Sequence, residues 1–262
     1  MYEIQTYLEE DGLLHCAVCK EPVEAFYPKG SFLEMRKHHR QCACERQAYA
    51  EEVKYYKEKE HQERVVRNKK ICFEEKEMED FIFQNVDRDS GAIRIAKEYV
   101  ANWQKMKKNH MGYLFWGPVG TGKSYLAACI ANALLEQEVT VKMTNFNTIL
   151  NDLFAAEDKT EYVRLLNVYE LLIIDDLGVE RNSEYALENI FSVIDWRYRS
   201  GKPLIITTNL PLAQLKQEIK IEKKRIYDRI LERCIPVKID GVSRRETMVN
   251  DNMQTMKNIL KI

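Results

Sequence analysis

The sequence predicts an α/β protein whose core is a parallel β-sheet covered by helices on both faces. From about residue 110 onward, short apolar runs alternate with segments of helical periodicity. The runs are continuously apolar, as in strands that are buried on both faces. Parallel strands also need long connections, and helices supply them here. The five strands are expected at residues 113–116, 139–143, 171–175, 204–208 and 235–239.

Helices are expected between these strands, where apolar residues recur every three or four positions. The predicted helices span residues 123–137, 146–156, 162–169, 184–200 and 223–233. The second of them carries an apolar stripe that includes Phe146, Ile149 and Leu153. A stripe at this spacing is most simply interpreted as a core-facing surface.

Composition excludes a uniformly basic nucleic-acid-binding coat, because 40 basic residues face 41 acidic ones, for a net charge of −1. No apolar run approaches the roughly 18 residues that a membrane span needs. The N-terminus shows no basic-then-apolar secretion signal. We therefore expect a cytoplasmic chain whose seven cysteines are not engaged in disulfides and which has no membrane partner.

A phosphate-binding loop is predicted directly between the first strand and the first of these helices. Residues 117–124 read GPVGTGKS, which matches the G-x-x-x-x-G-K-[ST] pattern in the context that this pattern requires. Backbone N–H groups of such a loop cradle phosphates, Lys123 is expected to reach the β- and γ-phosphates, and Ser124 to bind Mg²⁺. The predicted nucleotide-binding residues here are Gly117, Pro118, Val119, Gly120, Thr121, Gly122, Lys123, Ser124 and Tyr125.

Polar residues end two of the other strands. Asp175 and Asp176 follow an apolar run, and Asn209 follows the next strand. Ligands of open α/β sheets bind at the carboxyl edge, where these residues would meet. Asp175 is expected to complete the Mg²⁺ shell, Asp176 to orient or deprotonate the attacking water, and Asn209 to hold the water or the γ-phosphate.

Together these motifs resemble an AAA+ ATPase core, and within it the branch of DnaC/DnaI helicase loaders and IstB-like transposition helpers. The segments that carry the resemblance are GPVGTGKS at 117–124, LLIIDDLG at 171–178, KPLIITTNL at 202–210, RIYDRILE at 225–232 and GVSRRE at 241–246. The resemblance implies a catalytic set of Lys123, Asp176, Asn209, Arg229 and Arg244.

Within that set the resemblance implies that Asn209 is sensor 1, Arg229 a finger that enters a neighbour's ATP site, and Arg244 a sensor 2. The spacing of Arg225, Arg229 and Arg233 puts them on one helix face, which is equally compatible with a solvated basic surface. The second acid is usually Glu in AAA+ proteins, and the shorter Asp176 predicts slow ATP hydrolysis that a partner or DNA stimulates.

Four cysteines near the N-terminus have the spacing of a zinc site. Cys16 and Cys19 form a C-x-x-C pair, Cys42 and Cys44 form a C-x-C pair, and 22 residues separate the two pairs. Such pairs supply the four sulfur ligands that tetrahedral Zn²⁺ prefers. Three histidines are nearby rivals for a ligand position, namely His15, His38 and His39. A redox dithiol and unrelated free cysteines are the alternatives.

These observations predict three segments: a zinc-binding module at 1–44, a charged helical linker at 45–90, and an AAA+ ATPase core at 91–262. The resemblance implies that the zinc-binding module at 1–44 docks a partner. The resemblance implies ATP, Mg²⁺ and Zn²⁺ as cofactors and ATP-dependent loading of a DnaB-type replicative helicase onto single-stranded DNA, with self-assembly through the ATP sites. An IstB-like helper of a transposase and a nucleotide-switched scaffold with little hydrolysis are the alternative functions.

Overall fold

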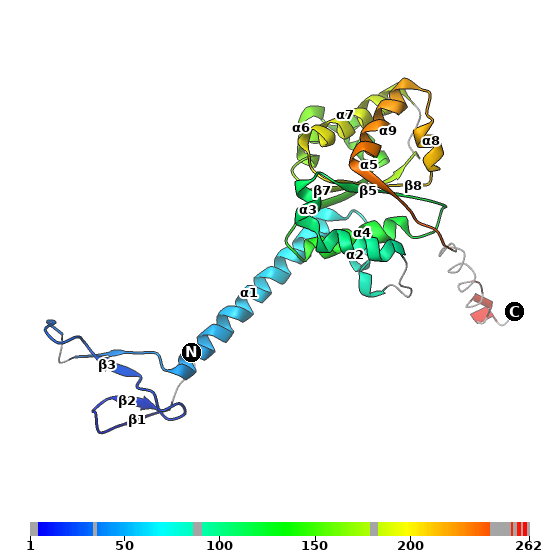
Figure 1. The fold of residues 1–262 in the computed structure, drawn as a ribbon. Helices are drawn as coiled ribbons and strands as arrows, with labels where there is room; N and C mark the ends of the chain where they lie inside the picture. The colour runs from blue at the N-terminus through cyan, green and yellow to red at the C-terminus, as the bar shows by residue number, and fades with distance from the viewer. Residues whose placement is uncertain are drawn as a thin grey trace. The chain divides into compact units, whose positions relative to one another are not determined.

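The computed structural model describes residues 5–33, 36–85, 91–178 and 183–241 together with positions 253, 256, 257, 259 and 260. The chain forms two compact units, residues 1–64 and residues 65–262 (Figure 1). The helix α1, Ala43–Cys72, begins in the first unit and ends in the second.

The larger unit is built on a five-stranded parallel sheet, which confirms the predicted fold class. Its strands follow the order β6-β7-β8-β5-β9. They are β5 (Gly112–Trp116), β6 (Val141–Asn145), β7 (Leu171–Leu177), β8 (Leu204–Thr208) and β9 (Cys234–Lys238). β6 begins later than predicted because the Val139 N–H bonds to the Leu134 carbonyl and so closes the turn that ends the preceding helix.

The five predicted helices are present with small changes at their ends. They are α4 (Lys123–Leu135), α5 (Phe146–Ala155), α6 (Lys159–Leu166), α7 (Glu184–Ser200) and α9 (Ile221–Arg233). Three further helices were not predicted from the sequence, namely α2 (Gly91–Ala101), α3 (Trp103–Lys108) and α8 (Leu212–Lys216). Short 3₁₀ turns at Lys76–Asp80 and Phe83–Asn85 were also missed.

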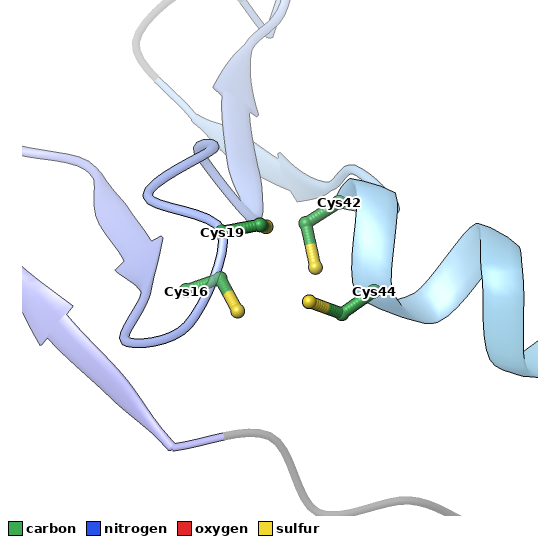
Figure 2. Close-up of side chains that lie close together, drawn as sticks. All are labelled: Cys16, Cys19, Cys42 and Cys44. Carbon is green, nitrogen blue, oxygen red and sulfur yellow. The ribbon is translucent and has the colours of Figure 1, made fainter.

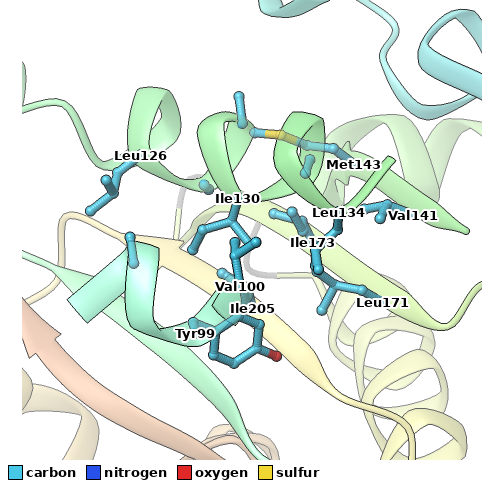
Figure 3. Packing of buried hydrophobic residues seen from close by; sticks show 14 of the residues in the cluster. Tyr99, Val100, Leu126, Ile130, Leu134, Val141, Met143, Leu171, Ile173 and Ile205 are labelled. Carbon is cyan, nitrogen blue, oxygen red and sulfur yellow. The ribbon is translucent and has the colours of Figure 1, made fainter. Parts of the chain in front are cut away.

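Alternate residues of each central strand enter two different cores. Ile173 and Ile205 pack with α2 and α4 on one face of the sheet, as Figure 3 shows. Leu172 and Ile206 pack with α5, α7 and α9 on the other face. Both faces are therefore buried, which is why β7 and β8 begin with continuous apolar runs instead of alternating apolar and polar residues.

The charged segment that was expected as a helical linker at 45–90 does not form one continuous helix. α1 ends at Cys72, and Cys72 and Phe73 are buried in the core beside α2 and α4. The following 3₁₀ segment is held to α4 by Asn132, whose side-chain amide donates to the carbonyls of Met78 and Phe81.

Among the described residues, no helix combines the length and apolarity that a membrane span requires.

The smaller unit contains two short antiparallel hairpins ahead of α1. They pair β1 (Thr6–Leu8) with β2 (Leu14–Cys16), and β3 (Glu24–Phe26) with β4 (Lys37–His39). The buried hydrophobic side chains of this unit's cluster are Cys16, Val23 and Cys42. So small an apolar core cannot stabilise a fold by itself, and domains of this size depend on disulfides or metals.

A buried arginine ties the connections of the sheet together. Arg197 on α7 is 1% exposed and donates to the carbonyls of Tyr169, Glu170 and Pro203, just before β7 and β8. Burial lowers the pKa of its guanidinium to about 9, so the group still carries its charge at neutral pH. Its donors replace the water that these carbonyls would otherwise need.

We expect Arg197→Met to lower the free energy of unfolding by about 3 kcal/mol, because it leaves buried carbonyls without donors. Urea denaturation measures this change. Arg164→Met, on the exposed side of α6, is the matched control and should change stability by less than about 0.5 kcal/mol. Equal free energies of unfolding for the two variants would contradict a stabilising role of the Arg197 hydrogen bonds.

Candidate nucleotide and metal sites

The phosphate loop leaves β5 at its carboxyl end and enters α4. Gly122 precedes the first residue of α4 and has φ +94°, a left-handed conformation that glycine adopts without strain. Gly117 lies against Ile239, the residue after β9, and an added Cβ would overlap the Ile239 carbonyl oxygen. The two glycines therefore permit the tight turn into α4, and the N-terminus of a helix offers unpaired backbone N–H groups to a phosphate.

Lys123 is held inside this loop. Its side chain is buried, and Nζ donates to the carbonyl oxygens of Gly117 at 3.1 Å and Pro118 at 2.7 Å. These carbonyls fix the position of the ammonium group inside the loop. The role of Lys123 in binding the β- and γ-phosphates stays a prediction.

The first acid of β7 reaches the phosphate loop. The Asp175 carboxylate accepts hydrogen bonds from the hydroxyls of Ser124 and Thr207, and Lys123 lies close enough to interact with it electrostatically. Burial raises the pKa of Asp175, while the two hydroxyls and the lysine counteract the rise. A hydroxyl beside a carboxylate is a hard-oxygen set of the kind that Mg²⁺ prefers, so these two residues fit the ion.

The second acid meets the predicted sensor. Asn209 Nδ2 donates to Asp176 Oδ1 at 3.3 Å, and the Asp176 N–H donates to Thr207 Oγ1 at 3.0 Å. The structure therefore brings together Lys123, Ser124 and the three polar residues at the ends of β7 and β8. All of them lie at the carboxyl edge of the sheet, as parallel strands require.

Other loop residues face different surroundings. The Tyr125 hydroxyl donates to the Ile82 carbonyl, and its ring packs on Phe81. Thr121 Oγ1 donates to Pro118 within the loop, whereas Val119 is exposed. Tyr125 therefore anchors the 3₁₀ segment through its side chain, and a nucleotide contact from this residue would come from its backbone.

The predicted finger lies on the other face of the sheet from α4. Arg229 Nε donates to Asp195 Oδ1 at 2.7 Å, and its guanidinium stacks on Phe191 of α7. Arg225 stacks on the same ring and Arg233 on Tyr198. The shared face of the three arginines thus covers aromatic side chains of α7 instead of being solvated throughout. Arg244, the proposed sensor 2, lies outside the described residues.

Two residues of these sites were not identified from the sequence. Thr207 contacts both acids, and Asp195 pairs with Arg229. Thr207 could have been found, because strand periodicity puts it on the same face as Asn209 two residues later. Asp195 gives no comparable signal, since its partner is 34 residues away on a different helix.

The four N-terminal cysteines converge, as Figure 2 shows. Their sulfur atoms lie within 4.8 Å of one another, in a group that includes no histidine among the described residues. Tetrahedral coordination with Zn–S bonds of about 2.3 Å requires sulfurs about 3.8 Å apart, so small side-chain movements complete the site. His15 is engaged elsewhere, with ring nitrogens 2.9 Å from Asp11 and from the Lys20 carbonyl.

Charge in the cluster is distributed unevenly. Backbone N–H groups of Glu21 and Cys44 lower the pKa of Cys19 to about 6, whereas hydrogen bonding to Cys19, together with burial, raises the pKa of Cys44 to about 12. Backbone donors that stabilise a thiolate also orient it toward a cation. The donor set of four thiols therefore fits Zn²⁺ and excludes hard cations, which prefer oxygen.

Comparison with known proteins gives relatives among helicase loaders. The replicative helicase loader DnaC of Escherichia coli (strain K12) is 29% identical over 144 residues, which cover 53% of this chain and 56% of DnaC. The loader DnaI of Bacillus subtilis (strain 168) is 24% identical over 179 residues, covering 62% and 58%. The matched part thus spans little more than half the length of these relatives.

Solved structures share the fold of the larger unit. A crystal structure of DnaI has a TM-score of 0.58 and 27% identity, covering 68% of this chain and 99% of that one. The DnaC helicase loader has a TM-score of 0.52 at 23% identity, covering 63% and 100%, and is a likeness of fold. The model of a family described as IstB-like ATP binding protein matches residues 41–251, and the chain therefore belongs to the IstB-like ATP-binding family.

Proposed function

We propose that this chain is an ATPase that loads a DnaB-type replicative helicase onto single-stranded DNA. The observation that carries the proposal is the meeting of the phosphate loop, Asp175, Asp176 and Asn209 at one edge of the sheet. The relatives named as helicase loaders support this use of the site over an IstB-like role in transposition.

The site residues divide the work of phosphoryl transfer. Lys123 binds the β- and γ-phosphates, and Ser124 and Asp175 hold the metal. Mg²⁺, when bound, neutralises charge on those phosphates. Asp176 accepts the proton of the attacking water or orients it, and Asn209 fixes the Asp176 carboxylate through its amide. Asp176 is shorter than the usual Glu, which supports slow turnover and stimulation by a partner or DNA.

The finger is proposed to act between subunits. Asp195 and Phe191 hold Arg229 on the α7–α9 surface, and both groups come from its own chain. An arginine on this surface reaches a γ-phosphate when a second copy docks head to tail, which generates a ring or a helical filament. The path for single-stranded DNA would form only when subunits stack in this way.

The N-terminal unit is proposed to be a zinc-binding module that docks the helicase. We assign it to residues 1–44, with the charged segment 45–90 as connector and residues 91–262 as the ATPase core. The cysteine cluster supports the metal, and the exposed side chains of the hairpins are available to a protein partner.

The loading function predicts distinct effects of two variants. Lys123→Ala should weaken nucleotide binding, because its charge contacts ground-state phosphates, whereas Asp176→Asn should bind ATP normally and lose hydrolysis. Fluorescent-nucleotide titration and phosphate release measure the two steps. Loading is measured as helicase-dependent unwinding of a primed circular single strand coated with single-strand-binding protein.

The parent chain should increase this unwinding when the helicase of the same host is supplied, and Lys123→Ala should not. Glu188 is an exposed acid on α7, and Glu188→Gln is the control for the loss of a negative charge in Asp176→Asn. Normal ATP hydrolysis without helicase binding would favour the transposase helper. Nucleotide binding with no hydrolysis under any condition would favour the switched scaffold.

The zinc site predicts one Zn²⁺ per chain, held by Cys16, Cys19, Cys42 and Cys44. Metal analysis of protein purified without chelator should find it, and the double variant Cys42→Ser/Cys44→Ser should lose it. Because structural zinc supplies folding free energy, chelation should unfold the N-terminal unit and spare nucleotide binding. Cys72→Ser, which alters a buried cysteine of the other unit, should retain the metal. Protein without zinc would refute this assignment.

The shared site predicts that Arg229→Ala binds ATP normally and hydrolyses it about 10³-fold or more slowly, as for arginine fingers elsewhere. Mixing Arg229→Ala with Lys123→Ala should restore part of the activity, because some interfaces then pair an intact loop with an intact finger. Arg94→Ala, exposed on α2, should behave like the parent. Mixtures that co-assemble without recovering activity would place the action of Arg229 within its own subunit.

A further inference from the structure

The two acids of the candidate site lie in a β-bulge. β7 and β8 pair regularly up to Ile174 opposite Ile206, and pairing resumes with Leu177 opposite Thr208. Two residues of β7, Asp175 and Asp176, therefore face a single residue of β8, Thr207. Bulges of this kind redirect side chains at the ends of strands and next to functional sites.

The Thr207 hydroxyl joins the two halves of this bulge. It donates to the Asp175 carboxylate and accepts the Asp176 N–H at 3.0 Å. Thr207 is 0% exposed, so water does not compete for either of these hydrogen bonds. A hydroxyl has one donor and two acceptor positions, and this one uses both functions on consecutive residues.

The bulge places Asp176 in a conformation that it would not adopt unaided. Its φ is +55°, in the left-handed region, which is strained for a residue with a Cβ. In a regular strand, consecutive side chains point to opposite faces. Here Asp175 reaches Ser124 while Asp176 reaches Asn209, so both acids serve the same edge of the sheet.

A second threonine closes the bulge without touching either carboxylate. Thr208 Oγ1 donates to the Leu177 carbonyl at 2.7 Å and accepts the Leu210 N–H at 3.0 Å. The position of the acids themselves therefore depends on Thr207. Its methyl group is fully buried, which fixes the rotamer and hence the direction of the hydroxyl.

We infer that Thr207 is a positioning residue for ATP hydrolysis, which sets the Mg²⁺-binding acid and the water-orienting acid at a fixed separation by bonding both. The inference rests on the proposed ATPase function. The role is indirect, since Thr207 acts through Asp175 and Asp176. Phosphate binding belongs instead to Lys123 and the loop, so removal of the hydroxyl separates turnover from affinity.

The test compares Thr207→Val with Thr207→Ser. Valine keeps the branched shape and loses the hydroxyl, and serine keeps the hydroxyl. Thr207→Val should lower kcat about 10- to 100-fold, the scale expected when a catalytic group is misplaced by a fraction of an ångström to one ångström. Its affinity for a fluorescent ATP analogue should stay within about threefold of the parent, since the loop is unchanged. Thr207→Ser should restore at least half of kcat.

Thr144→Val is the matched control. Thr144 is also a buried strand threonine whose hydroxyl donates to a carboxylate, but this carboxylate is that of Glu74 at 2.8 Å and not one of the two acids. It should turn over like the parent. Parent-like kcat in Thr207→Val, or equal losses in the valine and serine variants, would overturn the inference.

A crystal structure of Thr207→Val separates this inference from the proposed function. Release of Asp176 from the left-handed region, with loss of the Asp175–Asp176 bulge, is expected. An unchanged bulge would overturn the positioning role whether or not the parent hydrolyses ATP. A parent that does not hydrolyse ATP under any condition would overturn the ATPase proposal. The crystal structure of Thr207→Val would still show whether Thr207 positions the two acids.

Discussion

Burial of the parallel sheet on both faces is the constraint on which the larger unit depends. A strand covered by helices on each side has no position for a polar side chain in its middle, because unpaired polar groups there would lose their water. Polar residues are therefore confined to the strand ends, as in β7 and β8. Since parallel strands end at one edge, their polar residues meet the phosphate loop there.

The charged side chains at this edge have hydrogen-bond partners within the protein and also lie where a phosphate or a metal ion can bind. Lys123 donates to backbone carbonyls, and Asp175 accepts from hydroxyls of Ser124 and Thr207. Lys123 and Asp175 also interact electrostatically with each other. The site thus holds a cation and an anion at buried and partly buried positions, where electrostatic interactions with phosphate and metal are stronger than in water.

Periodicity and motifs were sufficient to predict the five strands, five of the helices around them, the phosphate loop and the cysteine cluster, because each depends on local sequence. The missed features depend on tertiary contacts. Cys72 and Phe73 end the charged helix by entering a core whose other members lie far along the chain. The bulge at Asp175 and Asp176 arises from pairing with β8, and the sequence of β7 alone does not determine the register of that pairing. Asp195 acquires a role through a helix 34 residues away.

Under the proposed function, the pair of Asp195 and Arg229 makes assembly part of catalysis. Within one chain the guanidinium is held by a carboxylate at 2.7 Å and by the Phe191 ring, so its direction is set before a neighbour arrives. Preorganisation of this kind reduces the entropy that would be lost when the finger enters the next subunit's site. The same ion pair limits the reach of Arg229, because moving it far would leave Asp195, which is mostly buried, with fewer partners. An arginine fixed in this way reaches the neighbouring ATP site only when the two subunits dock in the correct geometry. The rate of hydrolysis then depends on assembly and not on ATP binding alone.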